Sequence, residues 1–419
     1  MQTKLAPEFK GTRHGEAAEA ILRKCVHCGF CTATCPTYQL LGDELDSPRG
    51  RIYLMKQVLE GAPVTRKTQQ HLDRCLTCRS CETTCPSGVQ YGHLVDIGRE
   101  IVEARVERPA GEKAVRWLLK EGLTSSLFGP AMKVGQLVRP LLPQALKNKV
   151  PGPAGKRAQQ WPTRTHKRKV LMLLGCVQPA MMPNVNSATA RVLDAAGIQT
   201  LVADGAGCCG ALRTHLNDAA GGLADMRRNI DAWWPLVNGL TSEGRVEAIV
   251  MNASGCGVAV KDYGHALAHD ADYAEKARKV SALTRDISEL LPDIAPALQG
   301  KLREIKTKRL AFHPPCTLQH GQQLRGGVET HLRALGFEVR LASAESHLCC
   351  GSAGTYSVLQ PELATQLRDR KLGHLEAPAV QDPVDAIVSA NIGCIQHLQS
   401  GTSTPVRHWV EVLDDALAG

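Results

Sequence analysis

The sequence predicts an α+β multidomain fold, with a mainly helical domain at the N-terminus followed by a duplicated α/β domain built on parallel sheets. Two observations predict this fold. The sixteen cysteines are divided equally between residues 1–105 and 169–419, and in each region a cysteine motif occurs twice. We expect a helical domain at 1–105, a helical and basic linker at 106–168, and α/β repeats at 169–300 and 301–419.

The N-terminal region contains the pattern C-x2-C-x2-C-x3-C-P at residues 25–36 and again at 75–86. This is the bacterial ferredoxin spacing, in which three closely spaced thiolates hold one [4Fe–4S] cluster and the fourth ligates the other cluster. The predicted ligands of the first cluster are Cys25, Cys28, Cys31 and Cys85, and those of the second are Cys75, Cys78, Cys81 and Cys35. Zinc knuckles are the alternative, but they do not require two interlocked runs that end in proline. The intervening segments 48–55 and 68–74 are expected to be helical.

The residues around these runs indicate electron transfer and no catalysis on this chain. Clusters of this kind carry single electrons and have no open iron position for a substrate. No G-x-G-x-x-G motif opens a helix after a strand, so we expect the flavin on another chain and assign no catalytic residue here. Nearby positive charges are candidates for stabilising an added electron, although ordinary surface positions are the alternative; they are Arg49, Arg51, Arg74 and Arg79.

The linker combines a loosely helical pattern around Trp117 with a proline-rich stretch from Pro140 to Pro153. From Gly122 to Leu193 there is no Asp or Glu but there are eleven Lys and Arg, in a chain whose net charge is +9. Such a strip suits an anionic lipid surface or an acidic partner, and a solvated linker is the alternative. Nucleic acid is disfavoured, because no stacking aromatics interleave with the charges. Without a signal core or an apolar spanning run, we expect a cytoplasmic location.

The C-terminal region repeats a vicinal-cysteine motif. The gaps from the first cysteine to the cysteine pair are 32 and 33 residues, and those from the pair to the last cysteine are 47 and 44. Expected strands at 170–174, 200–202 and 248–251 alternate with helices at 186–196 and 218–234, which indicates a parallel sheet. Each cysteine follows a strand, so the carboxyl ends of the strands can bring them together.

We therefore expect a further site in each repeat, for an iron–sulfur cluster or zinc, with reduced, packed thiols as the alternative. The candidate ligands are Cys176, Cys208, Cys209 and Cys256 in the first repeat, and Cys316, Cys349, Cys350 and Cys394 in the second. Because each pair precedes a glycine at a strand-to-helix turn, we expect the helix N-terminus to lower the pKa of its thiols.

Five segments together resemble the iron–sulfur subunit family of bacterial glycolate oxidase (glycolate dehydrogenase) over nearly the whole chain: Cys25–Met55, Leu72–Gly88, Asn229–Pro235, Leu348–Tyr356 and Ala390–Cys394. The wider group contains the iron–sulfur subunit of anaerobic glycerol-3-phosphate dehydrogenase and other vicinal-cysteine (CCG) domain proteins. The resemblance implies a hetero-oligomer with two FAD-type subunits that oxidise glycolate, and D-lactate as well. This chain would pass electrons through two [4Fe–4S] clusters to a membrane acceptor such as quinone, at the cytoplasmic face of the inner membrane.

Two alternatives remain open. One is the iron–sulfur subunit of another flavin dehydrogenase, acting on lactate or glycerol 3-phosphate. The other is an enzyme similar to heterodisulfide reductase that works at the second repeat. In that group the repeat ends in C-x-x-C, whereas this sequence has Ala259 and His397 at the last position. The departure puts a noncubane cluster in question, especially in the first repeat.

Overall fold

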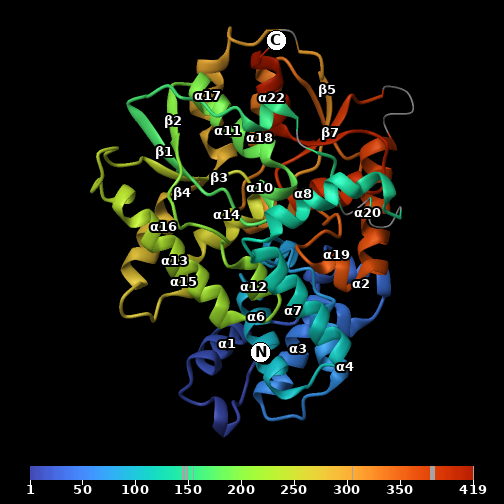
Figure 1. The fold of residues 1–419 in the computed structure, drawn as a ribbon. Helices are drawn as coiled ribbons and strands as arrows, with labels where there is room; N and C mark the ends of the chain where they lie inside the picture. The colour runs from blue at the N-terminus through green and yellow to red at the C-terminus, as the bar shows by residue number, and fades with distance from the viewer. Residues whose placement is uncertain (144–146, 148–149, 154, 304, 378–382, 419) are drawn as a thin grey trace.

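The computed structural model describes residues 1–143, 147, 150–153, 155–303, 305–377 and 383–418. Figure 1 shows the N-terminal helices in blue at one end and two α/β units, in green to yellow and in orange to red, side by side at the other. The helices α7 (Ala110–Thr124) and α8 (Phe128–Val138) lie across the front of the junction in this view. The fold class predicted from the sequence is confirmed.

The N-terminal unit contains six helices in the described chain, together with short turns of 3₁₀ helix. The helices are α1 (Arg13–Lys24), α2 (Pro36–Leu41), α3 (Pro48–Leu59), α4 (Arg66–Asp73), α5 (Ser80–Thr84) and α6 (Tyr91–Arg105), and the turns are η1 (Pro7–Phe9), η2 (Phe30–Thr32) and η3 (Glu44–Asp46). The predicted helices at 48–55 and 68–74 are thus present as α3 and α4. Helix α3 begins where the Ser47 hydroxyl accepts from the Gly50 amide, with Pro48 in the first turn.

The linker forms α7 and α8, followed by the turns η4 (Arg139–Leu141) and η5 (Lys156–Gln159). Neither α7 nor α8 has a fully buried residue, so their apolar side chains are not enclosed by the rest of the chain. Part of the predicted basic strip is paired with carboxylates outside it: Arg157 and Arg191 pair with Asp414, and Arg164 pairs with Asp194. Of the eleven basic residues, Lys149 lies outside the described residues.

The two repeats have the same sheet topology. In the first, β2 (Ile198–Leu201), β1 (Arg168–Met172), β3 (Ala248–Met251) and β4 (Thr284–Asp286) lie in that order, all parallel. In the second, the order is β6 (Glu338–Leu341), β5 (Arg309–Phe312), β7 (Ala386–Ser389) and β8 (Val406–His408), again all parallel. The predicted strands are present within two residues at each end. The edge strands β4 and β8 were not predicted, because three-residue segments with charged side chains carry no apolar run.

The helices of the first repeat are α10 (Gln178–Met181), α11 (Pro183–Ala195), α12 (Ala211–His215), α13 (Ala219–Val237), α14 (Ser254–Lys261), α15 (Tyr263–Ala266) and α16 (Ala274–Leu283), followed by η6 (Ile287–Leu290) and α17 (Leu291–Leu298). Those of the second are η7 (Thr317–Gly321, a π-helical turn), α18 (Gly327–Ala334), α19 (Tyr356–Leu359), α20 (Pro361–Glu376), α21 (Ile392–Gln399) and α22 (Trp409–Ala418).

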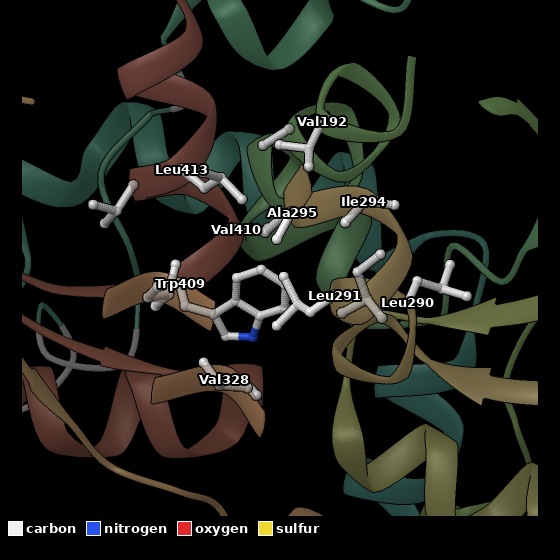
Figure 2. Packing of buried hydrophobic residues seen from close by; sticks show 14 of the residues in the cluster. Val192, Leu290, Leu291, Ile294, Ala295, Val328, Trp409, Val410 and Leu413 are labelled. Atoms are coloured by element: carbon white, nitrogen blue, oxygen red, sulfur yellow. The ribbon is translucent and has the colours of Figure 1, made fainter. Parts of the chain in front are cut away.

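One hydrophobic core joins the two repeats. Figure 2 shows the Trp409 indole of α22 among Leu291 of α17 and Val328 of α18, with Val192 of α11 nearby. Trp409 has no exposed surface. The predicted boundary at residue 300 falls between α17 and β5, but this core is continuous across it. Burial of these side chains therefore fixes the repeats against each other.

Candidate metal centres

The first predicted ligand set surrounds one cavity. Cys25, Cys28, Cys31 and Cys85 all line it, together with apolar side chains such as Ile52. The loop between the first three thiols turns through left-handed residues, His27 at φ 59° and Gly29 at φ 90°. The same local backbone recurs fifty residues later, at Thr77 (φ 53°) and Arg79 (φ 59°). Thiols from two distant runs around one cavity fit a cluster bound through thiolates.

The second predicted set lies deeper, and three of its four members are buried, Cys35, Cys75 and Cys81. Burial raises the pKa of both Cys78 and Cys81. The negative charge of a neighbouring thiol adds to it, that of Cys316 for Cys78 and that of Cys78 for Cys81, followed for both by Cys75 and Cys35. Thiols that influence one another in this way are neighbours, although they come from both runs. The backbone amide of Thr77 donates to the Cys75 sulfur at 3.4 Å and the Tyr91 hydroxyl donates to it at 3.6 Å. Both donors are thus directed at the sulfur of a predicted cluster ligand.

Arg51 is the one of the four predicted arginines that lies fully inside this site. Its side chain is 1% exposed and donates to the Asp46 carboxylate at 3.1 Å, the Thr37 hydroxyl at 3.1 Å and the His71 carbonyl at 2.6 Å. Burial opposes its charge, but the negative groups around it, including Cys75 and Cys35, outweigh that effect and raise its pKa. Arg51 is thus a fixed positive charge beside the second thiol set.

The other three arginines are less enclosed. Arg74 pairs with the buried Asp46 at 2.9 Å, Arg49 pairs with Glu44 at 2.6 Å, and Arg79 pairs with Glu82 at 2.8 Å. His27 is exposed and tilts against the Tyr53 ring at 6.3 Å between ring centroids. Arg49 and Arg79 therefore have carboxylate partners of their own, close to the cysteine loops.

The first repeat brings its four cysteines together at the carboxyl ends of β1, β2 and β3. Cys176 interacts with Cys208, and Cys209 with Cys256, the third residue of α14. The Gly210 amide donates to the Cys208 sulfur at 3.4 Å. Interactions with the thiols of Cys176 and Cys209 are the largest causes that lower the pKa of Cys208, and hydrogen bonds from the backbone amides of Gly210 and Leu212 add to them.

The pKa is not lowered in the other three cysteines of the vicinal pairs, which are Cys209, Cys349 and Cys350. Interaction with Cys208, and then with Cys256, raises the pKa of Cys209. In the second repeat the pKa of both Cys349 and Cys350 is raised. For Cys349, interaction with Cys316 lowers the pKa, but the Cys350 thiol and burial outweigh it. For these three cysteines, neighbouring thiols and burial together raise the pKa, so the predicted lowering by the helix N-terminus is not seen.

The second repeat contains a further donor that the sequence pattern did not identify. The sulfurs of Cys316 and Cys349 are 3.8 Å apart, and Cys350 interacts with Cys394. Donor atoms of His313, Cys350 and Cys394 all lie within 4.8 Å of one another. A histidine three residues before the first cysteine of the repeat was the available signal.

A cavity of about 460 Å³ lies where the N-terminal unit and both repeats meet. Its cysteine lining comes from all three: Cys75, Cys78, Cys176, Cys208, Cys209, Cys256, Cys316, Cys349 and Cys394. Ala259 and His397, which stand where a C-x-x-C ending would have its last cysteine, also line this cavity. Leu76 and Cys78 pack in one cluster with Cys316 and Cys349, so the second thiol set adjoins the second repeat. The volume is within the range of cavities that bind small organic molecules.

Comparison with known families agrees with this arrangement. Residues 21–89 match the 4Fe-4S dicluster domain, and residues 170–261 and 310–399 each match the cysteine-rich domain. The fold and thiol sites thus define a two-cluster iron–sulfur protein with a duplicated cysteine-rich domain.

Individual relatives narrow this class. The chain is 55% identical to the glycolate oxidase iron-sulfur subunit of Escherichia coli, covering 100% of this chain and 99% of the relative. It is 30% identical to the probable glycolate oxidase iron-sulfur subunit of Bacillus subtilis, covering 91% and 89%. The chain belongs to this family of glycolate oxidase iron–sulfur subunits, which confirms the resemblance found in the sequence. Lactate utilization protein A of Geobacillus thermodenitrificans is 25% identical over 59% of this chain and 98% of its own length.

Proposed function

We propose that this chain is the electron-transfer subunit of a glycolate dehydrogenase complex, with D-lactate as a further substrate. It would accept electrons from FAD on partner subunits and pass them singly to a membrane acceptor. The observation that carries the proposal is the pair of thiol sets, each built from both ferredoxin runs, in a chain 55% identical over its whole length to a glycolate oxidase iron-sulfur subunit. When bound, two [4Fe–4S] clusters would supply the one-electron carriers.

The residues of this chain have two tasks in that function. Cys25, Cys28, Cys31 and Cys85 would hold one cluster, and Cys75, Cys78, Cys81 and Cys35 the other. The buried charge of Arg51 would stabilise the reduced state of the second centre, because a nearby cation favours an added electron. The contact of Cys78 with Cys316 and Cys349 supports electronic connection between the N-terminal unit and the second repeat.

The proposed partners are two FAD-type subunits and a quinone. The cavity of about 460 Å³ supports a quinone headgroup as acceptor, because it is large enough and adjoins the thiols of the second set. Among the described residues there is no helix long and apolar enough to cross a membrane. We propose that this chain reaches a lipid-soluble acceptor at the membrane surface.

Helices α7 and α8 support a peripheral position on the inner membrane. Large apolar side chains along them and the turn that follows are more than half exposed: Trp117, Leu118, Leu127, Val134, Leu137 and Leu141. Lys133 and Arg139 accompany them, and neither α8 nor η4 contains an acidic residue. Exposed apolar side chains next to positive charges suit the interface of an anionic bilayer. Sedimentation of the complex with vesicles, compared with a Leu137→Asp variant, tests this; equal sedimentation of the two would contradict it.

The cluster assignment and the electron transfer can be tested together. In anaerobically purified complex, Cys25→Ser and Cys85→Ser should erase the same cluster signal in electron paramagnetic resonance. Cys75→Ser and Cys35→Ser should erase the other, and Cys176→Ser should leave both. Glycolate should reduce the wild-type clusters only when the flavin partners are present. FAD bound tightly to the isolated chain, or fewer than two clusters, would contradict the proposal.

A second candidate is a thiol–disulfide reductase acting at the second repeat, which the 3.8 Å approach of the Cys316 and Cys349 sulfurs favours. Replacing Cys349 with Ser separates the two functions. Transfer from flavin to acceptor that survives this change, with bound iron unchanged, excludes catalysis at this repeat.

A further inference from the structure

His313 is a buried histidine whose ring has no hydrogen-bond partner. It is 1% exposed, and neither ring nitrogen, Nδ1 or Nε2, finds a donor or acceptor. Leaving a polar ring of this kind buried and unpaired destabilises the folded chain. A partner absent from the polypeptide would remove that cost. The ring lies at the end of β5, where its backbone amide donates to the Val388 carbonyl at 2.8 Å, so its position is fixed by the sheet.

Two thiols lie close enough to this ring to share a metal with it. Donor atoms of His313, Cys350 and Cys394 lie within 4.8 Å of one another, and all three residues are buried. Cys394 is the third residue of α21, and the Asn391 amide group lies 3.8 Å from its sulfur. Cys350 precedes Gly351, which adopts φ 87° and leaves no room for a side chain against the Ala364 carbonyl. The loop and the helix thus hold both thiols toward the end of β5.

The charges of this group fit a divalent cation. Two thiolates, one neutral imidazole and one divalent ion have no net charge, which lowers the cost of burying them. In its neutral form an imidazole offers a ring-nitrogen lone pair to a metal, and neither ring nitrogen of His313 is engaged by another group. The nearby cation Lys371 is 2% exposed and donates to the Glu345 carbonyl at 2.6 Å.

The first repeat has a leucine at the position that corresponds to His313. Leu173 and His313 both stand three residues before the first cysteine of their repeat and directly follow equivalent central strands. The Leu173 amide donates to Val250 just as the His313 amide donates to Val388. The two positions are therefore equivalent, and only the second repeat has an imidazole there.

We propose that His313, together with Cys350 and Cys394, ligates a thiophilic metal centre in the second repeat, and that its imidazole is a ligand the first repeat does not have. Thiolates combined with imidazole suit zinc or iron, the latter alone or in a cluster. This inference rests on the proposed metal site of the second repeat and adds its nitrogen ligand. The two repeats then hold chemically different centres, although their sheets and cysteine spacing are the same.

The test compares wild type, His313→Leu and His313→Cys in the full chain, purified anaerobically. His313→Leu copies the residue of the first repeat, and His331→Leu, a half-buried histidine of α18, is the matched control. Metal analysis during competition with EDTA gives the metal and its affinity. Pulsed electron paramagnetic resonance with ¹⁵N-histidine detects nitrogen bound to iron, or to Co²⁺ where zinc is the native metal.

We expect metal beyond that of the two ferredoxin clusters, with histidine nitrogen coupling in wild type and in His331→Leu. In His313→Leu the coupling should vanish and the affinity should fall by more than about 10-fold. His313→Cys should recover metal without the coupling. Absence of extra metal in wild type, or coupling unchanged in His313→Leu, would overturn the inference. The signals of the two ferredoxin clusters are recorded in the same samples, so failure of the proposed electron-transfer function would be seen separately.

Discussion

Replacing Arg51 with Met tests whether the second thiol set depends on a buried charge network. Arg51 makes hydrogen bonds to Asp46, Thr37 and the His71 carbonyl, and Asp46 has no exposed surface. Removing one member of a buried ion pair costs about 3–5 kcal/mol. Arg74 and His71 still contact Asp46, so we expect the lower end, about 3 kcal/mol, or roughly a 150-fold change in the unfolding equilibrium.

The assay is anaerobic urea unfolding of the complete chain, followed by cluster absorbance and circular dichroism. The control is Arg49→Met, since Arg49 pairs with Glu44 at the surface, where side chains are 31% and 46% exposed. Such a pair contributes less than about 1 kcal/mol. Arg51→Met should also lower the reduction potential of one cluster, because a stabilising cation is lost. Equal unfolding midpoints for the two variants would refute the reasoning.

Three further changes test packing and charge elsewhere. Gly351→Ala should destabilise the second repeat by about 2–5 kcal/mol, because its Cβ would lie 2.5 Å from a carbonyl oxygen at φ 87°. Arg108→Met should cost about 3 kcal/mol and expose α7 and α8 to proteases, since its side chain is 2% exposed and ion-paired. Burial lowers the pKa of His408 to about 3, so the unfolded chain binds more protons below about pH 6.5. The free energy of unfolding should therefore fall from pH 7.5 to 6, and less steeply in His408→Gln.

A control variant or a contradicting outcome accompanies each of these three predictions. Gly327→Ala meets open space, so thermal unfolding should stay within about 1 kcal/mol of wild type. Lys113 pairs with Glu107 at the surface, and Lys113→Met should leave proteolysis of α7 unchanged. Parallel pH profiles for wild type and His408→Gln would count against a buried neutral imidazole. Identical unfolding of Gly351→Ala and Gly327→Ala would count against the steric argument.

The N-terminal thiol sets were predictable because their chemistry is encoded in short spacings. Runs of three cysteines, each followed by a fourth and a proline, indicated two interlocked sites before any fold was known. The structure adds which charges enclose them. Nothing in the sequence distinguished Arg51 from Arg49, yet one is buried and the other is at the surface. That difference arises because the Arg51 side chain reaches Asp46 of η3, Thr37 of α2 and the His71 carbonyl of α4.

The basic strip shows a case in which a local pattern is incomplete. The absence of acidic residues between Gly122 and Leu193 indicated a basic segment suited to an anionic surface or an acidic partner. Folding brings Asp414, from the last helix, against Arg157 and Arg191. Charge counts along a segment ignore partners more than two hundred residues away.

The sequence alone determined the duplication and the parallel α/β sheets, and it predicted the two ferredoxin-type ligand sets, because each depends on local spacing or on apolar periodicity. Only the tertiary structure decided that the repeats share one core around Trp409 and that thiols from three parts of the chain line one cavity. It alone also placed His313 beside Cys350 and Cys394. The physical reason is that these contacts join residues distant along the chain, and burial brings them together only once the sheets and helices have packed.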